Sequence, residues 1–276
     1  MLTIKEFRKV SSIEEAYELN QKKTNRIIGG MLWLKMQTGN VNIAIDLSGL
    51  NLNTIEETDT EFKIGAMTTL RDLELHAGLN QYTNNSMKEA MRHIVGVQFR
   101  NLATVGGSIY GRYGFSDVLT IFMALDAYVE LHHAGIIPIS EFAKMPYDND
   151  VLVNIIVKKT ALNCAYLSHR QTKTDFPVLA VAVSKLHDKW QAVIGATPHR
   201  AVIIADEENI LGEKVSPETI EAFANYVKDN VKTDSNIRGS AQYRKHLAYV
   251  LVKRALVSIG EMLNDFKCMA QWKKNQ

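Results

Sequence analysis

The stretch Asn101–Leu131, which reads NLATVGGSIYGRYGFSDVLTIFMALDAYVEL, carries the strongest local signal in the chain. Its first half holds four glycines among small and hydroxyl residues, namely Gly106, Gly107, Gly111 and Gly114. Its second half begins at Ser116-Asp117 and becomes an apolar run with helical character, Val118–Leu125. Glycines let backbone N–H groups approach a ligand, and a helix start adds unpaired N–H groups and a positive dipole end. The pattern favours an anion such as a pyrophosphate, although a turn-rich connection without a ligand would have the same glycine content.

A second glycine pair lies nearer the N-terminus. Arg26–Ile28 is predicted to be a short buried strand, which stops at Gly29-Gly30 and passes into MLWLKMQ, a predicted short helix. Asn42–Leu47 is the next predicted strand, so the segment reads as a small β-α-β unit. A strand-to-helix turn of this kind suits phosphate oxygens, and a tight turn that needs two residues without a Cβ is the alternative.

The composition excludes several classes of protein. The chain has 276 residues, 46% hydrophobic and 22% charged, which is ordinary for a globular protein of two domains or of one large domain. A net charge of +2 gives no reason to expect nucleic acid or an anionic membrane as a partner, and no apolar segment is long enough to cross a bilayer. We expect a cytoplasmic protein, because MLTIKEFRKVSS lacks the apolar core of a signal peptide.

The cysteines and histidines give no metal site. Cys164 and Cys268 are the only two cysteines, they match no metal spacing, and we expect both to be free thiols. The chain therefore lacks the roughly four ligands that an iron–sulfur cluster needs. The pair His132-His133 has no carboxylate or cysteine placed by the sequence to join it, so a solvated turn is the favoured interpretation.

Further elements follow from periodicity and capping signals. In the first part of the chain, the predicted elements are a strand at 2–7, a helix at 13–21 capped by Ser11 or Ser12, a hairpin over 51–70, a helix at 69–77 capped by Thr68 or Thr69, a helix at 87–93 capped by Ser86, and a strand at 128–132. In the second part, strands at 151–157, 165–167, 178–184 and 190–194 are predicted to form a meander.

Two helices complete the predicted C-terminal part. Ser216-Pro217 opens the first helix, with serine as the cap and proline at the first helical position. The second runs over 240–266, and its apolar face, Leu247, Val250, Leu251, Ala255, Ile259 and Met262, indicates core or interface. The predicted domains are 1–160, with sub-domains of about 1–55 and 56–160, and 161–276.

Several motifs together resemble one protein family. They are Ile28-Gly29-Gly30, then QFRN at 98–101 with ATVGGSI at 103–109 and Ser116-Asp117, then GATPHRA at 195–201, and finally RGSAQYR at 238–244. In this order and spacing, which covers nearly the whole chain, they resemble the FAD-binding medium subunit of molybdenum hydroxylases of the xanthine dehydrogenase and carbon monoxide dehydrogenase type. The resemblance implies an α+β protein with the FAD-binding type-2 (PCMH-like) fold. That fold has two α/β sub-domains and a C-terminal domain of antiparallel sheet and helices.

The resemblance also implies a site for FAD and assigns its residues. The expected cofactor-binding residues are Ile28, Gly29, Gly30, Met31 and Leu32 in the first loop, Thr104, Gly106, Gly107 and Ser108 in the second, then Asp117, and Val153 or Leu152 against the isoalloxazine. The glycine N–H groups of both loops would grip the pyrophosphate, and the Thr104 hydroxyl would donate to a phosphate oxygen. Asp117 would accept from ribityl or ribose hydroxyls, or serve as a helix-start acid, or both. No catalytic or metal-binding residue is assigned.

The implied function is electron transfer. Electrons from a molybdopterin-binding large subunit would reach FAD through a [2Fe-2S] small subunit and leave to NAD⁺ or another acceptor. Two alternatives stay open: a stand-alone FAD-dependent reductase or oxidase of the same fold, and a scaffold subunit that has lost its flavin. The scaffold alternative comes from Met31-Leu32, which stand where the family usually has Thr-Asp. The same departure suggests weak FAD retention by the isolated subunit.

Overall fold

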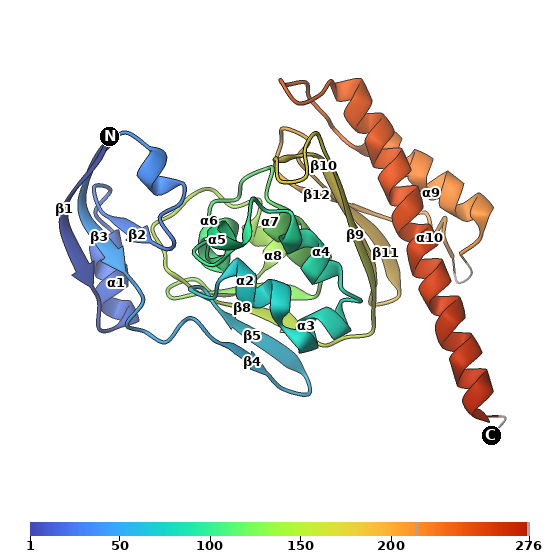
Figure 1. Cartoon of the computed structure of the whole chain (residues 1–276), viewed down its shortest axis with the longest axis horizontal. Coiled ribbons are helices and arrows are strands. Elements are labelled where there is room, and N and C mark those ends of the chain that lie inside the picture. The colour runs from blue at the N-terminus through green and yellow to red at the C-terminus, as the bar shows by residue number, and fades with distance from the viewer. Residues whose placement is uncertain (213–214, 275–276) are drawn as a thin grey trace.

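The computed structural model describes residues 1–212 and 215–274, with 262–274 described by backbone only. The fold is of the α+β class and contains three separate sheets (Figure 1). The N-terminal sheet lies at one side, a body of short helices over a second sheet lies in the middle, and a third sheet with two long helices lies at the other side. Among the described residues, no helix has the length and apolar character needed to span a membrane.

The N-terminal sheet is parallel and has the order β1-β3-β2. Its elements are β1 (Leu2–Lys9), α1 (Ile13–Asn20), β2 (Arg26–Ile28) and β3 (Gly39–Asp46). Helix α1 begins where Ser12 accepts a hydrogen bond from the N–H of Glu15, as the capping pattern predicts. The predicted helix after Gly30 is wrong. Met31 has a left-handed φ of 60°, which interrupts any regular helix, and only one 3₁₀ turn, η1 (Leu34–Met36), forms.

The central sheet is antiparallel, with the order β4-β5-β8-β6-β7. Its strands are β4 (Ile55–Glu57), β5 (Glu61–Gly65), β6 (Ala127–Leu131), β7 (Gly135–Pro138) and β8 (Leu152–Lys158). The helices of this part are α2 (Leu70–Leu75), α3 (Ala77–Tyr82), α4 (Ser86–Arg92), α5 (Val97–Arg100), α6 (Val105–Tyr110), α7 (Asp117–Met123) and α8 (Ile139–Phe142). Every residue of α7 is buried, so this helix is the centre of the main core.

The capping predictions in this part have mixed outcomes. Thr69 caps α2 in a reciprocal capping box with Asp72, as predicted. The prediction that Ser86 caps the next helix is wrong. Asn85, in the left-handed region at φ 63°, precedes α4, and the Ser86 hydroxyl instead donates to the carbonyl of Cys164 at 3.1 Å.

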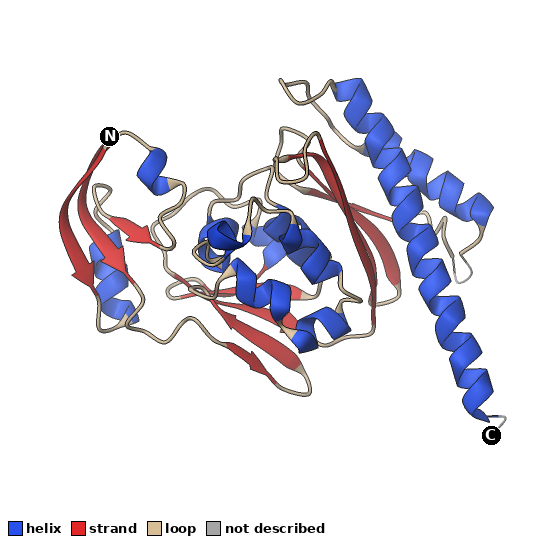
Figure 2. Ribbon diagram, viewed as in Figure 1, coloured by secondary structure: helices blue, strands red, loops and turns tan. Residues whose placement is uncertain are grey.

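The C-terminal sheet is an antiparallel meander with the order β12-β11-β10-β9 (Figure 2). It contains three of the four strands predicted for the meander. The fourth, predicted at 151–157, is β8 of the central sheet, and β12 was not predicted. Its strands are β9 (Leu162–Arg170), β10 (Pro177–Leu186), β11 (Lys189–Gly195) and β12 (Val202–Ala205). Helices α9 (Pro217–Asn230) and α10 (Ala241–Lys274) cover one face, while α4 and α7 pack on the other. Ser216 caps α9 with Pro217 at the first helical position, as predicted.

The apolar face predicted for α10 is largely confirmed. Leu247, Leu251, Ala255 and Ile259 are buried against the C-terminal sheet and α9, and Val250 is half-buried. The side chains of Met262 and Cys268 lie outside the described residues.

Cys164 is a free thiol, and burial raises its pKa to about 12. The turn predicted at His132-His133 is present, and the ring of Tyr17 stacks on His133.

Arg244, the last residue of the RGSAQYR motif, ties α10 to the sheet beneath it. Its side chain is 1% exposed and donates to the carbonyls of Val178 and Ala196 at 2.9 and 3.1 Å. It also donates to the carbonyl of Asp234 at 2.7 Å and to the Asn236 side chain at 2.7 Å. One guanidinium therefore satisfies acceptors from two strand ends and from the loop before α10.

We predict that Arg244→Met lowers the free energy of unfolding by on the order of 3 kcal/mol, because several buried acceptors lose their donor together. Urea denaturation followed by circular dichroism measures this change. Arg254→Met is the matched control, because Arg254 is exposed on the same helix. Equal midpoints for the two variants would contradict the role assigned to Arg244.

Candidate functional site

One cavity of about 750 Å³ opens where the three parts of the chain meet. Gly29 and Gly30 line it from the N-terminal part, Thr104 and Gly107 from the central part, and Phe176 from the C-terminal part. Its volume falls in the range of sites that enclose small-molecule ligands. The two glycine-rich stretches, far apart in the sequence, therefore share a single cavity, as the resemblance implies.

The first loop is pressed directly against the second. A Cβ on Gly30 would lie 1.8 Å from the carbonyl oxygen of Leu102, and one on Gly29 would lie 2.5 Å from Oγ1 of Thr104. Both positions therefore require glycine, because the backbone of the second loop and the Thr104 side chain lie where a Cβ would be. The N–H groups of Gly29, Gly30, Met31 and Leu32 donate to no protein acceptor within the described part of the chain. These groups remain available to a ligand with acceptor oxygens.

The second loop differs from the expectation. Its glycines lie inside the short helix α6, capped by Thr104, instead of in an open loop. The N–H of Gly106 donates to the carbonyl of Ala66 at 2.8 Å, and the N–H of Gly107 donates to Oγ1 of Thr104 at 3.2 Å. Both N–H groups therefore have acceptors within the protein, and their contact with a phosphate stays a prediction.

The two glycines of α6 lack a side chain for different physical reasons. A Cβ on Gly106 would lie 2.7 Å from the carbonyl of Ala66, so this glycine permits packing against the central part. A Cβ on Gly107 would meet only Oγ1 of Thr104, at 3.1 Å, and Gly107 lines the cavity. Thr104 uses its oxygen as an acceptor, which leaves its hydroxyl hydrogen free to donate. Ser108 also lines the cavity, but its hydroxyl donates to the carbonyl of Thr104.

A buried ion pair between Arg100 and Glu74 anchors the segment that leads into the second loop. Arg100 is 4% exposed, and its Nε lies 2.8 Å from Oε2 of Glu74. Arg71 contacts the same oxygen at 2.8 Å. Burial opposes ionisation of Glu74, yet the hydrogen bonds from Arg71 and Arg100 hold its pKa below its ordinary value. The chain from Arg100 to Thr104 is therefore anchored on α2, opposite the first loop.

Asp117, at the start of α7, connects the central part to β9. It is 5% exposed, and its Oδ1 lies 2.5 Å from a guanidinium nitrogen of Arg170 and accepts the hydroxyl of Tyr166. Burial raises the pKa of Asp117, and Arg170 and Tyr166 oppose that shift. Both Asp117 and Arg170 line the cavity. The second oxygen, Oδ2, accepts no side-chain or loop hydrogen bond within the described residues, so the expected contact with a ligand hydroxyl stays a prediction.

Of the two alternatives expected to contact the isoalloxazine, Val153 or Leu152, the structure places Leu152 at the cavity, and the contact itself stays a prediction. Val153 does not line the cavity, and its carbonyl accepts the N–H of Ala66 at 2.9 Å. Leu152, the neighbouring residue on β8, lines the cavity. Because successive residues of a strand face opposite ways, one position in register decides which side chain reaches the site. Ile28, Met31 and Leu32 line the cavity as expected.

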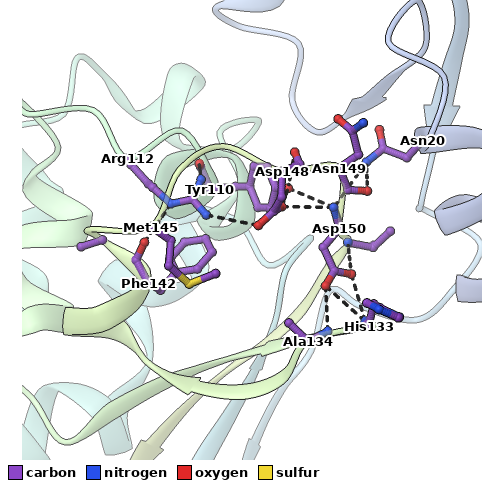
Figure 3. A network of polar contacts seen from close by, with 12 residues as sticks. Asn20, Tyr110, Arg112, His133, Ala134, Phe142, Met145, Asp148, Asn149 and Asp150 are labelled. Carbon is purple, nitrogen blue, oxygen red and sulfur yellow. Dashed lines mark hydrogen bonds and ion pairs between the residues drawn. The ribbon is translucent and has the colours of Figure 1, made fainter.

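A network of polar contacts supplies part of the cavity lining (Figure 3). The hydroxyl of Tyr110 donates to the carboxylate of Asp148 and to the carbonyl of Asp150. Asn20 reaches across from α1 and donates to the carbonyl of Asn149 at 2.7 Å. The Asp150 carboxylate accepts backbone N–H groups from the turn after β6. These contacts hold 148–150 in place between the N-terminal and central parts.

A cluster of aromatic side chains also lines the cavity, and no sequence pattern predicted it. Its rings are Trp33, Phe99, Tyr113, Phe115 and Phe176, and all line the cavity. Trp33 stacks on Phe176 with ring centroids 5.5 Å apart, and Phe115 meets Phe176 edge-on at 4.6 Å. The sequence does place aromatic residues close to each glycine motif. That these residues meet in one cluster depends on tertiary contacts, which the sequence pattern does not reveal.

Comparisons with known proteins agree on the family. The family description "FAD binding domain in molybdopterin dehydrogenase" matches residues 4–161, and "CO dehydrogenase flavoprotein C-terminal domain" matches 165–259. The nicotine 6-hydroxylase medium subunit of Paenarthrobacter nicotinovorans is 26% identical, over 91% of this chain and 95% of that protein. The glyceraldehyde dehydrogenase medium chain of Sulfolobus acidocaldarius is 24% identical, over 91% and 97%. A chain in the carbon monoxide dehydrogenase structure from Hydrogenophaga pseudoflava has the same fold, with a TM-score of 0.82 at 24% identity, over 93% and 97%.

We predict that Gly30→Ala destabilises the protein by about 2 kcal/mol, because the new methyl group overlaps the Leu102 carbonyl and must force the two loops apart. Urea titration of the ligand-free protein measures the effect. Gly107→Ala is the matched control, and we expect it to be neutral or slightly stabilising because the position is helical and open. A wild-type midpoint for Gly30→Ala would show that the loops do not meet as described.

We predict that Glu74→Gln costs about 3 kcal/mol at neutral pH, because it leaves the buried Arg100 without its counter-ion. The pKa of Glu74 is lower in the folded state than its ordinary value, so its stabilising contribution is present above that ordinary value. This contribution is lost as the pH falls through the folded-state pKa. The difference in the free energy of unfolding between wild type and variant should therefore become smaller in that pH range. Denaturation at several pH values tests this, with Glu89→Gln, at the exposed pair with Arg92, as the control. A gap that stays constant as the pH falls would refute the assignment.

Proposed function

The chain belongs to the family of FAD binding domains of molybdopterin dehydrogenases, and from this premise we propose that it is the FAD-binding medium subunit of a molybdenum-containing hydroxylase or dehydrogenase. In this proposal it relays electrons from the [2Fe-2S] clusters of a partner subunit, through FAD, to NAD⁺ or another acceptor. A separate large subunit binds molybdopterin and selects the substrate. The proposed location is the cytoplasm.

The observation that carries the proposal is the shared cavity between the two glycine loops. Gly29–Leu32 supply backbone N–H groups without a protein acceptor, and Thr104 supplies a hydroxyl hydrogen from the facing loop. Both donors suit the oxygens of a diphosphate, so the residues present fit FAD. The fit depends on the backbone of the first loop, because Met31 and Leu32 bring no polar side chain to the site.

FAD supplies the redox chemistry when bound, and the residues of this chain bind it, orient it and shield it. The first loop would hold the diphosphate through Gly29 and Gly30. The free Oδ2 of Asp117 would accept a ribityl or ribose hydroxyl, while Arg170 and Tyr166 hold the carboxylate in position. Leu152 would pack against the cofactor in place of Val153. None of these groups is assigned a proton-transfer role.

The partner assignment follows from the relatives. Three of the matched proteins are named as medium subunits or medium chains, and the aligned region covers 97%, 95% and 83% of their length. We therefore propose that this chain also works inside a complex with a large molybdopterin-binding subunit and a small [2Fe-2S] subunit.

Purification of the complex from its source separates the candidate functions. Partner chains with molybdenum and iron support the proposal, whereas a lone yellow protein with its own turnover supports a stand-alone flavin enzyme. A complex without flavin supports a scaffold.

We predict that Gly107→Val abolishes FAD binding and leaves the chain folded, because the side chain projects into the cavity and meets only Thr104 at the helix surface. Flavin absorbance after reconstitution, together with calorimetric titration, should show at least a 100-fold loss of affinity. Gly260→Val is the control, since a Cβ there meets open space on α10. Normal flavin content in Gly107→Val would reject this site.

Full stoichiometric FAD in the isolated wild-type subunit would contradict the weak retention suggested by Met31-Leu32.

A further inference from the structure

One segment of the cavity wall has neither helix nor strand. It is the connection from α8 to β8, residues 143–150 with the sequence AKMPYDND, and we call it the strap. Its second half, 147–150, lines the cavity. No backbone N–H donates to a carbonyl of the strap within the described part of the chain. The strap is therefore held in place by the side chains that reach it.

The second half of the strap is held by the N-terminal and central parts (Figure 3). Asn20, at the end of α1, donates to the carbonyl of Asn149 at 2.7 Å. The hydroxyl of Tyr110, at the end of α6, lies 3.0 Å from the carbonyl oxygen of Asp148 and 3.1 Å from that of Asp150. These contacts leave the first half of the strap to other donors.

The first half of the strap is held by Arg200, which comes from the C-terminal domain. Arg200 belongs to the GATPHRA motif at 195–201, which leads from β11 to β12 and contributes no residue to the cavity lining. Its Nη1 lies 3.0 Å from the carbonyl oxygens of both Ala143 and Met145. The guanidinium also lies 5.6 Å from the centroid of the Tyr147 ring. One exposed arginine thus reaches three residues of the strap.

A second arginine, Arg112, fixes the point from which the strap departs (Figure 3). Its side chain is fully buried, and its Nε donates to the carbonyl of Phe142 at 2.9 Å. The guanidinium lies 3.8 Å from the centroid of the Phe142 ring. The last carbonyls of a helix have no partner within that helix, so cationic donors are well placed there. Arg112 and Arg200 together supply donors at the end of α8.

The GATPHRA motif is itself firmly placed. The N–H of Ala196 donates to the carbonyl of Gly114 at 2.7 Å, and the carbonyl of Ala196 accepts Nε of Arg244 at 3.1 Å. A Cβ on Gly114 would lie 2.1 Å from the carbonyl oxygen of His199, so the motif touches the central part through bare backbone. Arg200 therefore extends to the strap from a base with a defined position.

Resting on the proposed function, we propose that Arg200 is a positioning residue for cofactor binding. It holds the strap where residues 147–150 form a wall of the FAD cavity, and it acts only through the strap because it does not line the cavity itself. The GATPHRA motif thereby makes this wall depend on the docking of the C-terminal domain. A lysine at position 200 keeps the positive charge and a donor nitrogen, so it should restore part of the hold.

The strap contains a site for its own test, because the exposed Lys144 lies between the two residues whose carbonyls Arg200 holds. Trypsin cleaves after lysine, and it does so fastest where the chain is mobile. In the full-length ligand-free protein, we expect cleavage between Lys144 and Met145 to be about tenfold faster in Arg200→Met than in the wild type. Mass spectrometry of the two fragments measures this rate. Arg254→Met is the matched control, because Arg254 is an exposed arginine on α10 that does not line the cavity.

The rate of FAD dissociation measures the effect on the cofactor. After reconstitution, we expect FAD to leave Arg200→Met about tenfold faster than the wild type, and Arg254→Met at the wild-type rate. Arg200→Lys should lie between wild type and Arg200→Met in both cleavage and dissociation, which a general loss of stability would not produce. Circular dichroism reports whether each variant folds. If Arg200→Met does not fold, Arg200→Lys is compared with the wild type in both measurements.

The outcomes separate this proposal from the proposed function. Wild-type cleavage rates in Arg200→Met and Arg200→Lys would overturn the role of Arg200. Faster cleavage with an unchanged rate of FAD dissociation would also overturn it, because the strap would then have no influence on the cofactor. A wild-type protein that binds no FAD, alone or in its complex, would defeat the proposed function instead. The cleavage rates would then still show whether Arg200 holds the strap.

Discussion

The contact between the Gly30 backbone and the carbonyl of Leu102 determines how the N-terminal sheet meets the rest of the molecule. A Cβ at Gly30 would lie 1.8 Å from that oxygen, so the two loops can touch only through bare backbone. This approach turns two unremarkable strand–loop connections into the walls of one cavity. The N–H groups of residues 29–32 donate to no protein acceptor within the described part of the chain. Packing and ligand binding thus depend on the same missing side chain.

The C-terminal domain is held to this cavity by buried polar groups. Asp117 on α7 pairs with Arg170 on β9, and Arg244 fixes the start of α10 to the start of β10. Buried charges are costly unless they are paired and hydrogen-bonded, so each of these groups defines one arrangement more strictly than apolar packing would. The position of Phe176 between them follows from that constraint. The cavity wall supplied by this domain is therefore as well defined as the walls supplied by the two loops.

Elements with strong local signals could be predicted from the sequence, while roles that depend on tertiary contacts could not. Three of the predicted meander strands and the cap at Ser216 are confirmed, whereas the strand predicted at 151–157 pairs in the central sheet, because alternation does not say which neighbours a strand has. The helix after Gly30 was wrong because the left-handed Met31 breaks it. Glycine content predicted backbone approach at Gly106 correctly, but the approaching atom is the Ala66 carbonyl and not a ligand. Likewise, the strand pattern of β8 could not choose Leu152 over Val153, and nothing local indicated that Trp33 meets Phe176.

The apolar first loop has a physical consequence for the whole site. Backbone N–H groups recognise phosphate oxygens whichever side chains flank them, so replacing polar residues by Met31 and Leu32 leaves the diphosphate cradle in place. What such a replacement removes is the ability of the loop to distinguish one diphosphate ligand from another. Specificity then has to come from parts of the cavity that are far away in sequence, where the polar network around Asp148 and the aromatic cluster around Phe176 differ in chemistry. FAD has a flat ring at each end and ribityl and ribose hydroxyls between them, so its recognition draws on both the polar and the aromatic side chains that line the cavity.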